Sequence, residues 1–205
     1  MEYDQPIIIH AQPKTDLWRK PPSMDADNAP TLLISTLIDI HKFQSARVTV
    51  SADWNTLYDQ GGLIFFIPGE KGTFTWMKTG IEFFGGKPFV GSVFTNEWSD
   101  WALVPMGKEK NGKLTIQVER LVKEGKKLDS LWVYIVDEET GKKTLARQMT
   151  SWFTHDIPDQ KGTPDNRHIL VGIYAARPTV PAGEGRENEE LPVKLEGFKV
   201  QLFED

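Results

Sequence analysis

The chain has 205 residues, a length typical of one domain, and its 39% hydrophobic residues suffice for a buried core. Its formal net charge of -5 argues against nucleic acid or an anionic membrane as a partner. The absence of cysteine excludes disulfides, thiolate metal sites and a cysteine nucleophile.

The beginning of the chain carries no pattern of a targeting signal. Residues 1–6 contain no basic region, and the apolar run 7–9 is too short for a signal peptide. No run approaches the roughly 20 apolar residues that a membrane helix needs. We therefore expect a cytoplasmic protein that does not contact a membrane.

Residues 1–30 are predicted to form an irregular lead-in that packs on the rest of the chain. Prolines at positions 13, 21, 22 and 30 disfavour a continuous helix or a central strand. Leu17 and Trp18 are its expected anchors.

From residue 31 onwards the sequence is typical of β-strands. Apolar and polar residues alternate through 46–53, 75–84 and 114–119, which is the period of two of a strand. Glycine-containing turn signals separate these runs, and no stretch has the spacing of a long helix. Residues 154–166 and 178–192 are predicted to be loops.

This pattern predicts an all-β fold for residues 31–205, as a single domain. Ten or more strands in a chain of this size do not fit one open sheet. A jelly-roll β-sandwich of two curved antiparallel sheets is the expected solution.

The predicted strand 74–84 is the most informative segment for function. One of its faces is ordinary core, whereas the other carries Trp76, Lys78 and Glu82 beside two phenylalanines. Aromatic rings mixed with opposite charges are typical of a groove for a sugar or another small polar ligand. We therefore expect a polar-aromatic groove on the concave sheet.

Further residues are candidates for the same groove. Arg120 follows the core-facing row of its strand, so it needs a carboxylate, and Glu82 or Asp100 is the expected partner. We predict that Trp76, Lys78, Glu82, Asp100 and Arg120 share one concave face, with Tyr58 and Trp98 at its rim. The complete set of ligand-binding candidates is Tyr58, Asp59, Gln60, Trp76, Lys78, Glu82, Asn96, Trp98, Asp100 and Arg120.

A structural role is the alternative for these charges. Lys78, Glu82, Asp100 and Arg120 would then form a satisfied ion-pair network beneath the aromatic residues. Buried charge networks occur both at binding sites and in structural cores, so the sequence favours neither interpretation.

Catalysis has less support than binding. No predicted strand carries the alternating carboxylates of a sandwich glycosidase, and the four histidines lack the spacing of a metal site. We therefore expect no catalytic residues, no metal and no cofactor. A carboxylate pair assembled from Glu82, Glu119 or Asp100 keeps a glycan-active hydrolase as an alternative.

Several motifs together resemble a family of concanavalin A-like proteins of unknown function. They lie at residues 58–63, 76–82, 92–96, 99–101 and 171–178, and the resemblance spans roughly residues 31–203. The motif residues are Tyr58, Asp59, Gln60, Trp76, Lys78, Glu82, Thr95, Asn96, Ser99, Asp100 and Trp101. The lead-in at residues 14–22 is similar to the fungal branch, whose members are described as regulation-of-enolase proteins.

The resemblance implies a concanavalin A-like jelly roll and a cytoplasmic location, but no established reaction. Related sandwiches form accessory domains of β-xylosidases, which adds an analogy in favour of a carbohydrate groove. We expect a non-catalytic binding or regulatory protein whose partner is a saccharide, another small polar ligand or a protein. A purely protein-interacting regulator is a further alternative, and the sequence does not define an oligomeric state.

Overall fold

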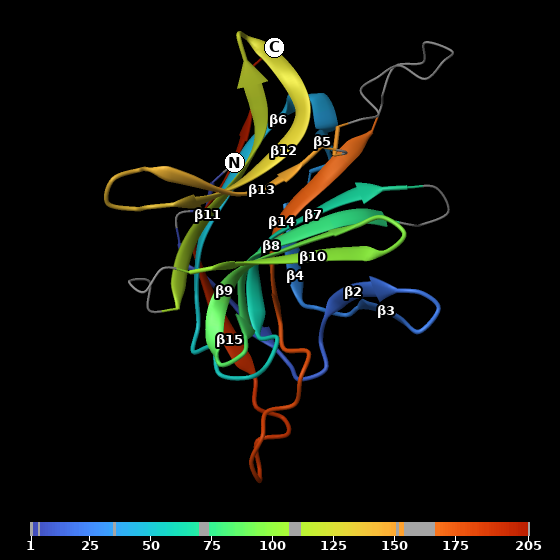
Figure 1. Cartoon of the computed structure of the whole chain (residues 1–205), viewed down its shortest axis with the longest axis vertical. Helices are drawn as coiled ribbons and strands as arrows, with labels where there is room; N and C mark the ends of the chain where they lie inside the picture. Colours follow the sequence, from blue (N-terminus) through green and yellow to red (C-terminus); the bar gives the residue numbers. More distant parts are fainter. Residues whose placement is uncertain are drawn as a thin grey trace.

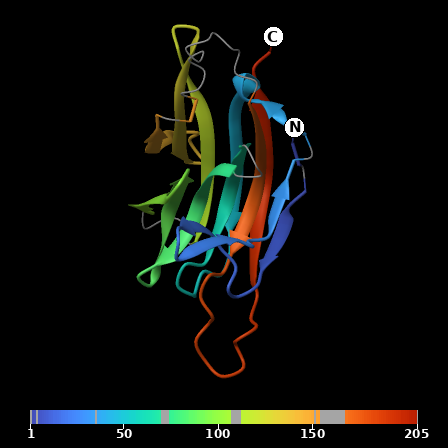
Figure 2. The same cartoon turned by 90° about the vertical axis from the view of Figure 1, so that its right-hand side faces the viewer.

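The computed structural model describes residues 2–3, 5–34, 36–69, 74–106, 112–150, 152–153 and 167–204. Two antiparallel sheets pack face to face in this part of the chain (Figures 1 and 2). The predicted loop at 154–166 lies outside the described residues.

Six strands form the first sheet. Its order is β1 (Ile7–Ala11), β15 (Leu191–Leu202), β6 (Phe43–Ser51), β11 (Lys113–Lys123), β12 (Lys126–Val136) and β13 (Lys143–Met149). The first and last parts of the chain therefore lie side by side, because β1 pairs with β15.

The second sheet has seven strands. Its order is β10 (Ser99–Pro105), β9 (Lys87–Thr95), β8 (Phe74–Phe84), β7 (Gln60–Pro68), β14 (His168–Ala176) and β4 (Thr31–Leu33), and β5 (Ile38–Asp39) also pairs with β14. A separate hairpin consists of β2 (Leu17–Lys20) and β3 (Met24–Asp27).

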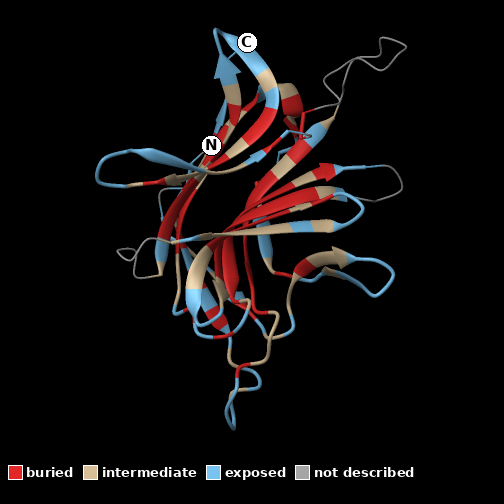
Figure 3. Ribbon diagram, viewed as in Figure 1, coloured by how far each residue is buried: buried red, intermediate tan, exposed pale blue. Residues whose placement is uncertain are grey.

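The hydrophobic core lies between the two sheets. Val48, Ile116 and Val133 face it from the six-stranded sheet, and Phe65 and Met77 face it from the seven-stranded sheet. All five are fully buried, as the red segments in Figure 3 show for the central strands. Since each such side chain contributes about 1.5–3 kcal/mol on burial, this alternation fixes which face of each strand points inwards.

The prediction of an all-β fold is confirmed. The described residues contain no α-helix, only one turn of 3-10 helix at Ile40–Lys42. None of their helices is long and apolar enough to cross a membrane.

The prediction of an irregular lead-in is wrong in part, because residues 7–27 contain the three strands β1, β2 and β3. Pro13 and the pair Pro21 and Pro22 lie between these strands rather than within them, so they interrupt no hydrogen-bond ladder. The β2–β3 hairpin lies against the seven-stranded sheet on the side away from the core (Figure 2).

Candidate functional site

A cavity of about 380 Å³ opens on the outer face of the seven-stranded sheet. The hairpin, strands β7 to β10 and the segment after β14 supply its walls. The lining residues are Asp16, Trp18, Met24, Tyr58, Gln60, Lys78, Glu82, Val93, Trp101, Pro178 and Thr179.

Strand register explains why these side chains meet. Lys78 pairs with Val93, and Val93 pairs with Trp101, so the three lie in one row across β8, β9 and β10. Their chain neighbours Met77 and Phe94 pack against the core instead. Successive side chains on a strand alternate between faces, so this row points away from the core.

A row of glycines lies next to this row. Gly62, Gly80 and Gly91 pair with one another across β7, β8 and β9, and they separate the row of Lys78 from the row that contains Gln60 and Glu82. A Cβ atom at Gly62 or Gly80 would collide with the backbone of the neighbouring strand, whereas the missing side chain at Gly91 leaves room for Glu82. The cavity lies between this part of the sheet and the hairpin.

Lys78 is buried beside the cavity and carries an ion pair. Its Nζ lies 3.0 Å from Asp16 Oδ1, and only 3% of the side chain is exposed. The same ammonium group lies 5.8 Å and 5.9 Å from the ring centres of Trp76 and Tyr174. A carboxylate and two ring faces thus compensate the desolvation of this charge.

Glu82 is the second charged group at the cavity. Only 7% of the residue is exposed, and its Oε2 accepts a hydrogen bond of 2.9 Å from Trp101 Nε1. Burial raises the pKa of Glu82, while the charge of Lys78 and the hydrogen bond from Trp101 oppose that shift.

Gly91 makes room for this carboxylate. A Cβ atom at Gly91 would lie 2.6 Å from Glu82 Oε2 and 2.9 Å from Glu82 Cβ. Any larger residue would therefore push Glu82 out of its position.

Three aromatic rings line the cavity. Trp18 and Trp101 meet edge to face, with ring centres 6.4 Å apart and planes at 89°. Tyr58 meets Trp101 at 6.2 Å and 71°. The rings therefore stand at steep angles to one another around the space above Glu82.

Gln60 links the polar groups at the base of the cavity. Its Nε2 donates to the Tyr58 carbonyl oxygen at 3.2 Å and to Asp16 Oδ1 at 3.4 Å, while its Oε1 accepts from the Tyr174 hydroxyl at 3.2 Å. Burial, together with the charges of Glu82 and Asp16, raises the pKa of Tyr174 well above its usual value, so this hydroxyl is a permanent donor.

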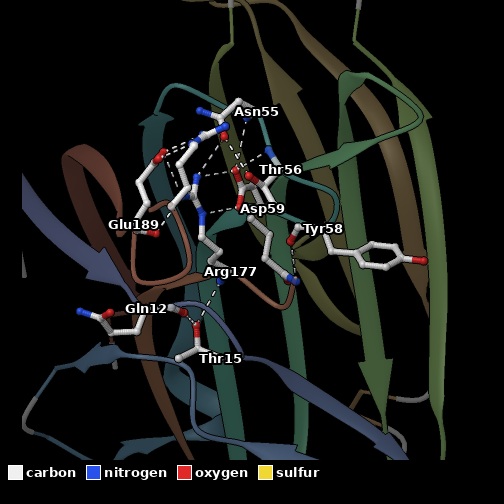
Figure 4. A network of polar contacts seen from close by, with 10 residues as sticks. Gln12, Thr15, Asn55, Thr56, Tyr58, Asp59, Arg177 and Glu189 are labelled. Carbon is white, nitrogen blue, oxygen red and sulfur yellow. Dashed lines mark hydrogen bonds and ion pairs between the residues drawn. The ribbon is translucent and has the colours of Figure 1, made fainter. Parts of the chain in front are cut away.

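A different buried network lies behind the cavity (Figure 4). Arg177 donates from Nε and Nη2 to the two carboxylate oxygens of Asp59, each at 2.9 Å, and both side chains are almost fully buried. Arg177 also donates to the Glu189 carbonyl oxygen at 2.9 Å and to Asn55 Oδ1 at 3.3 Å. Asp59 accepts from the backbone N–H of Thr56 at 3.0 Å.

Four of the candidates predicted from sequence line the cavity, namely Tyr58, Gln60, Lys78 and Glu82. Trp76 lies on the same outer face, buried in the second apolar cluster. Asp59 does not line the cavity, since its carboxylate is directed to Arg177, whereas the neighbouring Tyr58 ring extends away from that network (Figure 4).

Asp100 is not on this face, so its predicted placement is wrong. It pairs in register with the core-facing Phe94, and its side chain is 72% exposed and forms an ion pair of 3.1 Å with Arg147. Trp101, the next residue along β10, points into the cavity instead. A difference of one residue reverses the face of a strand.

The predicted placement of Arg120 is also wrong. Arg120 belongs to β11 of the six-stranded sheet, where its Nε donates to the Leu128 carbonyl oxygen at 2.7 Å. Its guanidinium group lies 4.1 Å from the centre of the Phe153 ring, which belongs to the core. The core-facing phase of Arg120 puts it on the opposite side of the seven-stranded sheet from Glu82.

Asn96 and Trp98 lie between β9 and β10 and do not line the cavity, so Trp98 is not at its rim. Asn96 accepts a hydrogen bond of 2.9 Å from Arg19 Nη1 at its carbonyl oxygen and one of 3.3 Å from Thr75 at Oδ1. Trp98 is 56% exposed.

Sequence reasoning missed the contribution of the lead-in, and it named Trp101 as a motif residue without assigning it to the groove. Asp16, Trp18 and Met24 come from the lead-in, and Trp101 comes from β10. The alternation within 99–105 would place Trp101 on the outer face once the register with the partner strand is known. Nothing in the lead-in indicated that Asp16 pairs with Lys78, 62 residues away. Among the described residues, no group of three or more His, Asp or Glu could hold a metal ion.

Comparison with known proteins places this fold in the class of concanavalin A-like jelly-roll sandwiches. The chain is similar over its full length to a functionally unknown protein from Saccharomyces cerevisiae, with a TM-score of 0.69, 21% identity and 93% of that chain covered. It also resembles one third (33%) of the GH43 protein BlXynB of Bacillus licheniformis, with a TM-score of 0.57, 12% identity and 96% of this chain covered.

The chain belongs to the family described as "Protein of unknown function (DUF1349)", whose model matches residues 1–202. An uncharacterized protein of Emericella nidulans is 39% identical over 178 residues, which cover 87% of this chain and 80% of the relative. Regulation of enolase protein 1 of Saccharomyces cerevisiae is 30% identical over 174 residues, which cover 84% and 73%. The resemblance inferred from the motifs is thus confirmed.

Proposed function

We propose that the chain is a non-catalytic binding protein that holds one small, hydroxyl-rich organic molecule, such as a saccharide, in the cavity. The observation that carries this proposal is the combination of three aromatic walls with the fixed polar groups of Gln60 and Glu82. Aromatic faces stack on the apolar faces of sugar rings, and fixed polar groups orient hydroxyls.

The volume supports a small ligand. Small-molecule sites in proteins measure roughly 300–1,000 Å³, so about 380 Å³ lies at the lower end of that range. The charge of Lys78 is already paired with Asp16, which leaves no free cation at the cavity, among the described residues, to attract an anionic ligand.

Calorimetric titration with monosaccharides, disaccharides and polyols tests the proposal. We expect Trp18→Ala and Trp101→Ala each to weaken binding at least tenfold, because each removes a wall of the cavity. Trp98→Ala is the matched control, since Trp98 is exposed outside the cavity, and it should bind like the original chain. Absence of binding across the whole panel would refute the proposal.

A glycan hydrolase is the second candidate function. Asp16 and Glu82 both line the cavity, and the pKa of Glu82 is raised, as that of a general acid has to be. One similar structure, at 12% identity, a TM-score of 0.51, and 97% coverage of this chain and 77% of that chain, is an endo-1,3-β-glucanase catalytic domain from Thermotoga petrophila. Release of reducing sugar from 1,3-β-glucan that disappears in Glu82→Gln would favour this function over binding alone.

A protein-interacting regulator is the third candidate, and it rests on the name of the yeast relative. Its direct test is the measurement of affinity between this chain and enolase by surface plasmon resonance, with and without saccharide. A regulatory role towards a glycolytic enzyme also agrees with a cytoplasmic location, which microscopy of the tagged chain would test. Micromolar or tighter binding to enolase, unaffected by Trp101→Ala, would move the function away from the cavity.

A further inference from the structure

The carboxylate of Glu82 is the one charge at the cavity that no ion pair neutralises within the described part of the chain. Lys78 and Asp16 neutralise each other at 3.0 Å. Glu82 accepts a hydrogen bond from Trp101, which is a neutral donor. The lining of the cavity therefore carries a net charge of about -1 when Glu82 is ionised, and a buried, unpaired carboxylate is unfavourable.

The position of this carboxylate is fixed by its surroundings. Gly91 leaves room for it at a distance where any Cβ atom would collide, and the Trp101 N–H holds Oε2 at 2.9 Å. The same indole ring forms one wall of the cavity. Glu82 is thus held at the base of the space into which a ligand would enter.

The aromatic walls suit a cation. Trp18 and Tyr58 meet Trp101 in edge contacts at 89° and 71°, and all three rings line the cavity, so a group that enters it contacts aromatic side chains. The negative faces of tryptophan and tyrosine rings attract organic ammonium groups, most strongly where water is excluded. An aromatic enclosure above a carboxylate combines two features that favour positive charge.

From this juxtaposition we infer that the ligand is a hydroxylated amine, such as an amino sugar, whose ammonium group is placed between the aromatic walls and the Glu82 carboxylate. The inference rests on the proposed function and names its ligand class. Gln60 lines the same cavity, and its Oε1, which accepts one hydrogen bond from Tyr174, can accept a second from a hydroxyl of the same molecule. Lys78 does not repel the ammonium group strongly, since Asp16 neutralises it at close range.

The test compares glucosamine with glucose and N-acetylglucosamine by calorimetric titration at about pH 6.5, where an amine with a pKa slightly below 8 is charged. The three sugars differ at one position, where they carry an ammonium group, a hydroxyl and a neutral amide. We expect glucosamine to bind at least tenfold more tightly than the two neutral sugars.

Glu82→Gln should abolish this preference, because glutamine keeps the shape of the side chain but removes its charge. Glucosamine binding in this variant should fall to the level of glucose binding measured on the same variant. Glu97→Gln is the control, since Glu97 is exposed outside the cavity. Circular dichroism of both variants checks that they are folded, and the comparison of sugars on the original chain needs no variant.

The outcomes separate the two proposals. Equal affinity for glucose and glucosamine, or a preference that survives Glu82→Gln, overturns the inference and leaves the proposed function standing. Failure of all three sugars and of the wider panel to bind overturns the proposed function and this inference together. A preference for glucosamine that depends on Glu82 supports both.

Discussion

Two groups of buried charged side chains are built differently. In the first, Arg177 and Asp59 meet through two parallel hydrogen bonds, and further partners such as Glu189 and Thr56 surround them. In the second, Lys78 is paired with Asp16, but Glu82 has Trp101 as its hydrogen-bond donor and faces a cavity.

The comparison separates a structural role from the binding role that we propose for the cavity. Arg177 joins the turn before β7 to the chain after β14, and its backbone N–H donates to Thr15 Oγ1 at 3.1 Å. Each of these segments leads directly into a cavity wall, at Tyr58, Pro178 and Asp16. The Arg177–Asp59 network holds the walls in place, and Glu82 faces the cavity.

The largest loss of stability is expected when the ion pair between Arg177 and Asp59 is broken. Arg177→Met should lower the free energy of unfolding by about 3–5 kcal/mol, because it leaves the buried Asp59 carboxylate without its cation. Urea unfolding at neutral pH measures this change. A loss below about 1 kcal/mol would show that Asp59 is rehydrated and that the network is less closed than its geometry indicates.

A smaller loss of stability is expected when the ion pair between Lys78 and Asp16 is broken. Lys78→Met keeps the apolar stem of the side chain but removes the ammonium group from Asp16. Because the Asp16 side chain is 22% exposed and can be rehydrated, we expect a loss of about 1–3 kcal/mol. The same urea experiment gives the value. If Lys78→Met costs as much as Arg177→Met, the distinction between the two groups fails.

Gly91→Ala should displace Glu82 at a moderate cost of about 1–3 kcal/mol, since the new methyl group overlaps the carboxylate. The sharper readout is the indole N–H signal of Trp101 in an NMR spectrum, which should shift when Glu82 moves away. Gly125→Ala, in a turn with no atom within 4 Å of the new Cβ, should leave that signal unchanged. An unshifted signal in Gly91→Ala would mean that the carboxylate does not depend on this glycine.

The smallest effect is a change in pH dependence. The raised pKa of Glu82 means that the folded chain holds this proton more tightly than the unfolded chain does. Stability from this group is therefore present at low pH and is lost as pH rises from about 4.5 through the folded pKa. Glu82→Gln removes the titrating carboxyl group, so this loss of stability with rising pH does not occur in the variant.

Relative to the original chain, the melting temperature of Glu82→Gln should therefore rise between about pH 4 and pH 7. Differential scanning calorimetry across this range measures the rise. Glu97→Gln, at an exposed position, should show no such trend. A difference between Glu82→Gln and the original chain that is independent of pH would indicate a packing effect rather than a titration.

Alternation along single strands determined much of this protein. The period of two in 46–53, 75–84 and 114–119 defines β6, β8 and β11, and it places Trp76, Lys78 and Glu82 together on one face. This works because a half-buried strand repeats every two residues without reference to its neighbours. The all-β sandwich follows from many such strands.

Only the tertiary structure decided how the strands and the lead-in combine. The turn at 96–98 sets the phase of β10, so that Trp101 rather than Asp100 faces the cavity, and no local pattern encodes that offset. Arg120 belongs to the other sheet because β11 pairs with β6 and β12. Asp16 reaches Lys78 because the hairpin docks on the outer face. Such contacts depend on the packing of distant segments, which a single sequence does not reveal.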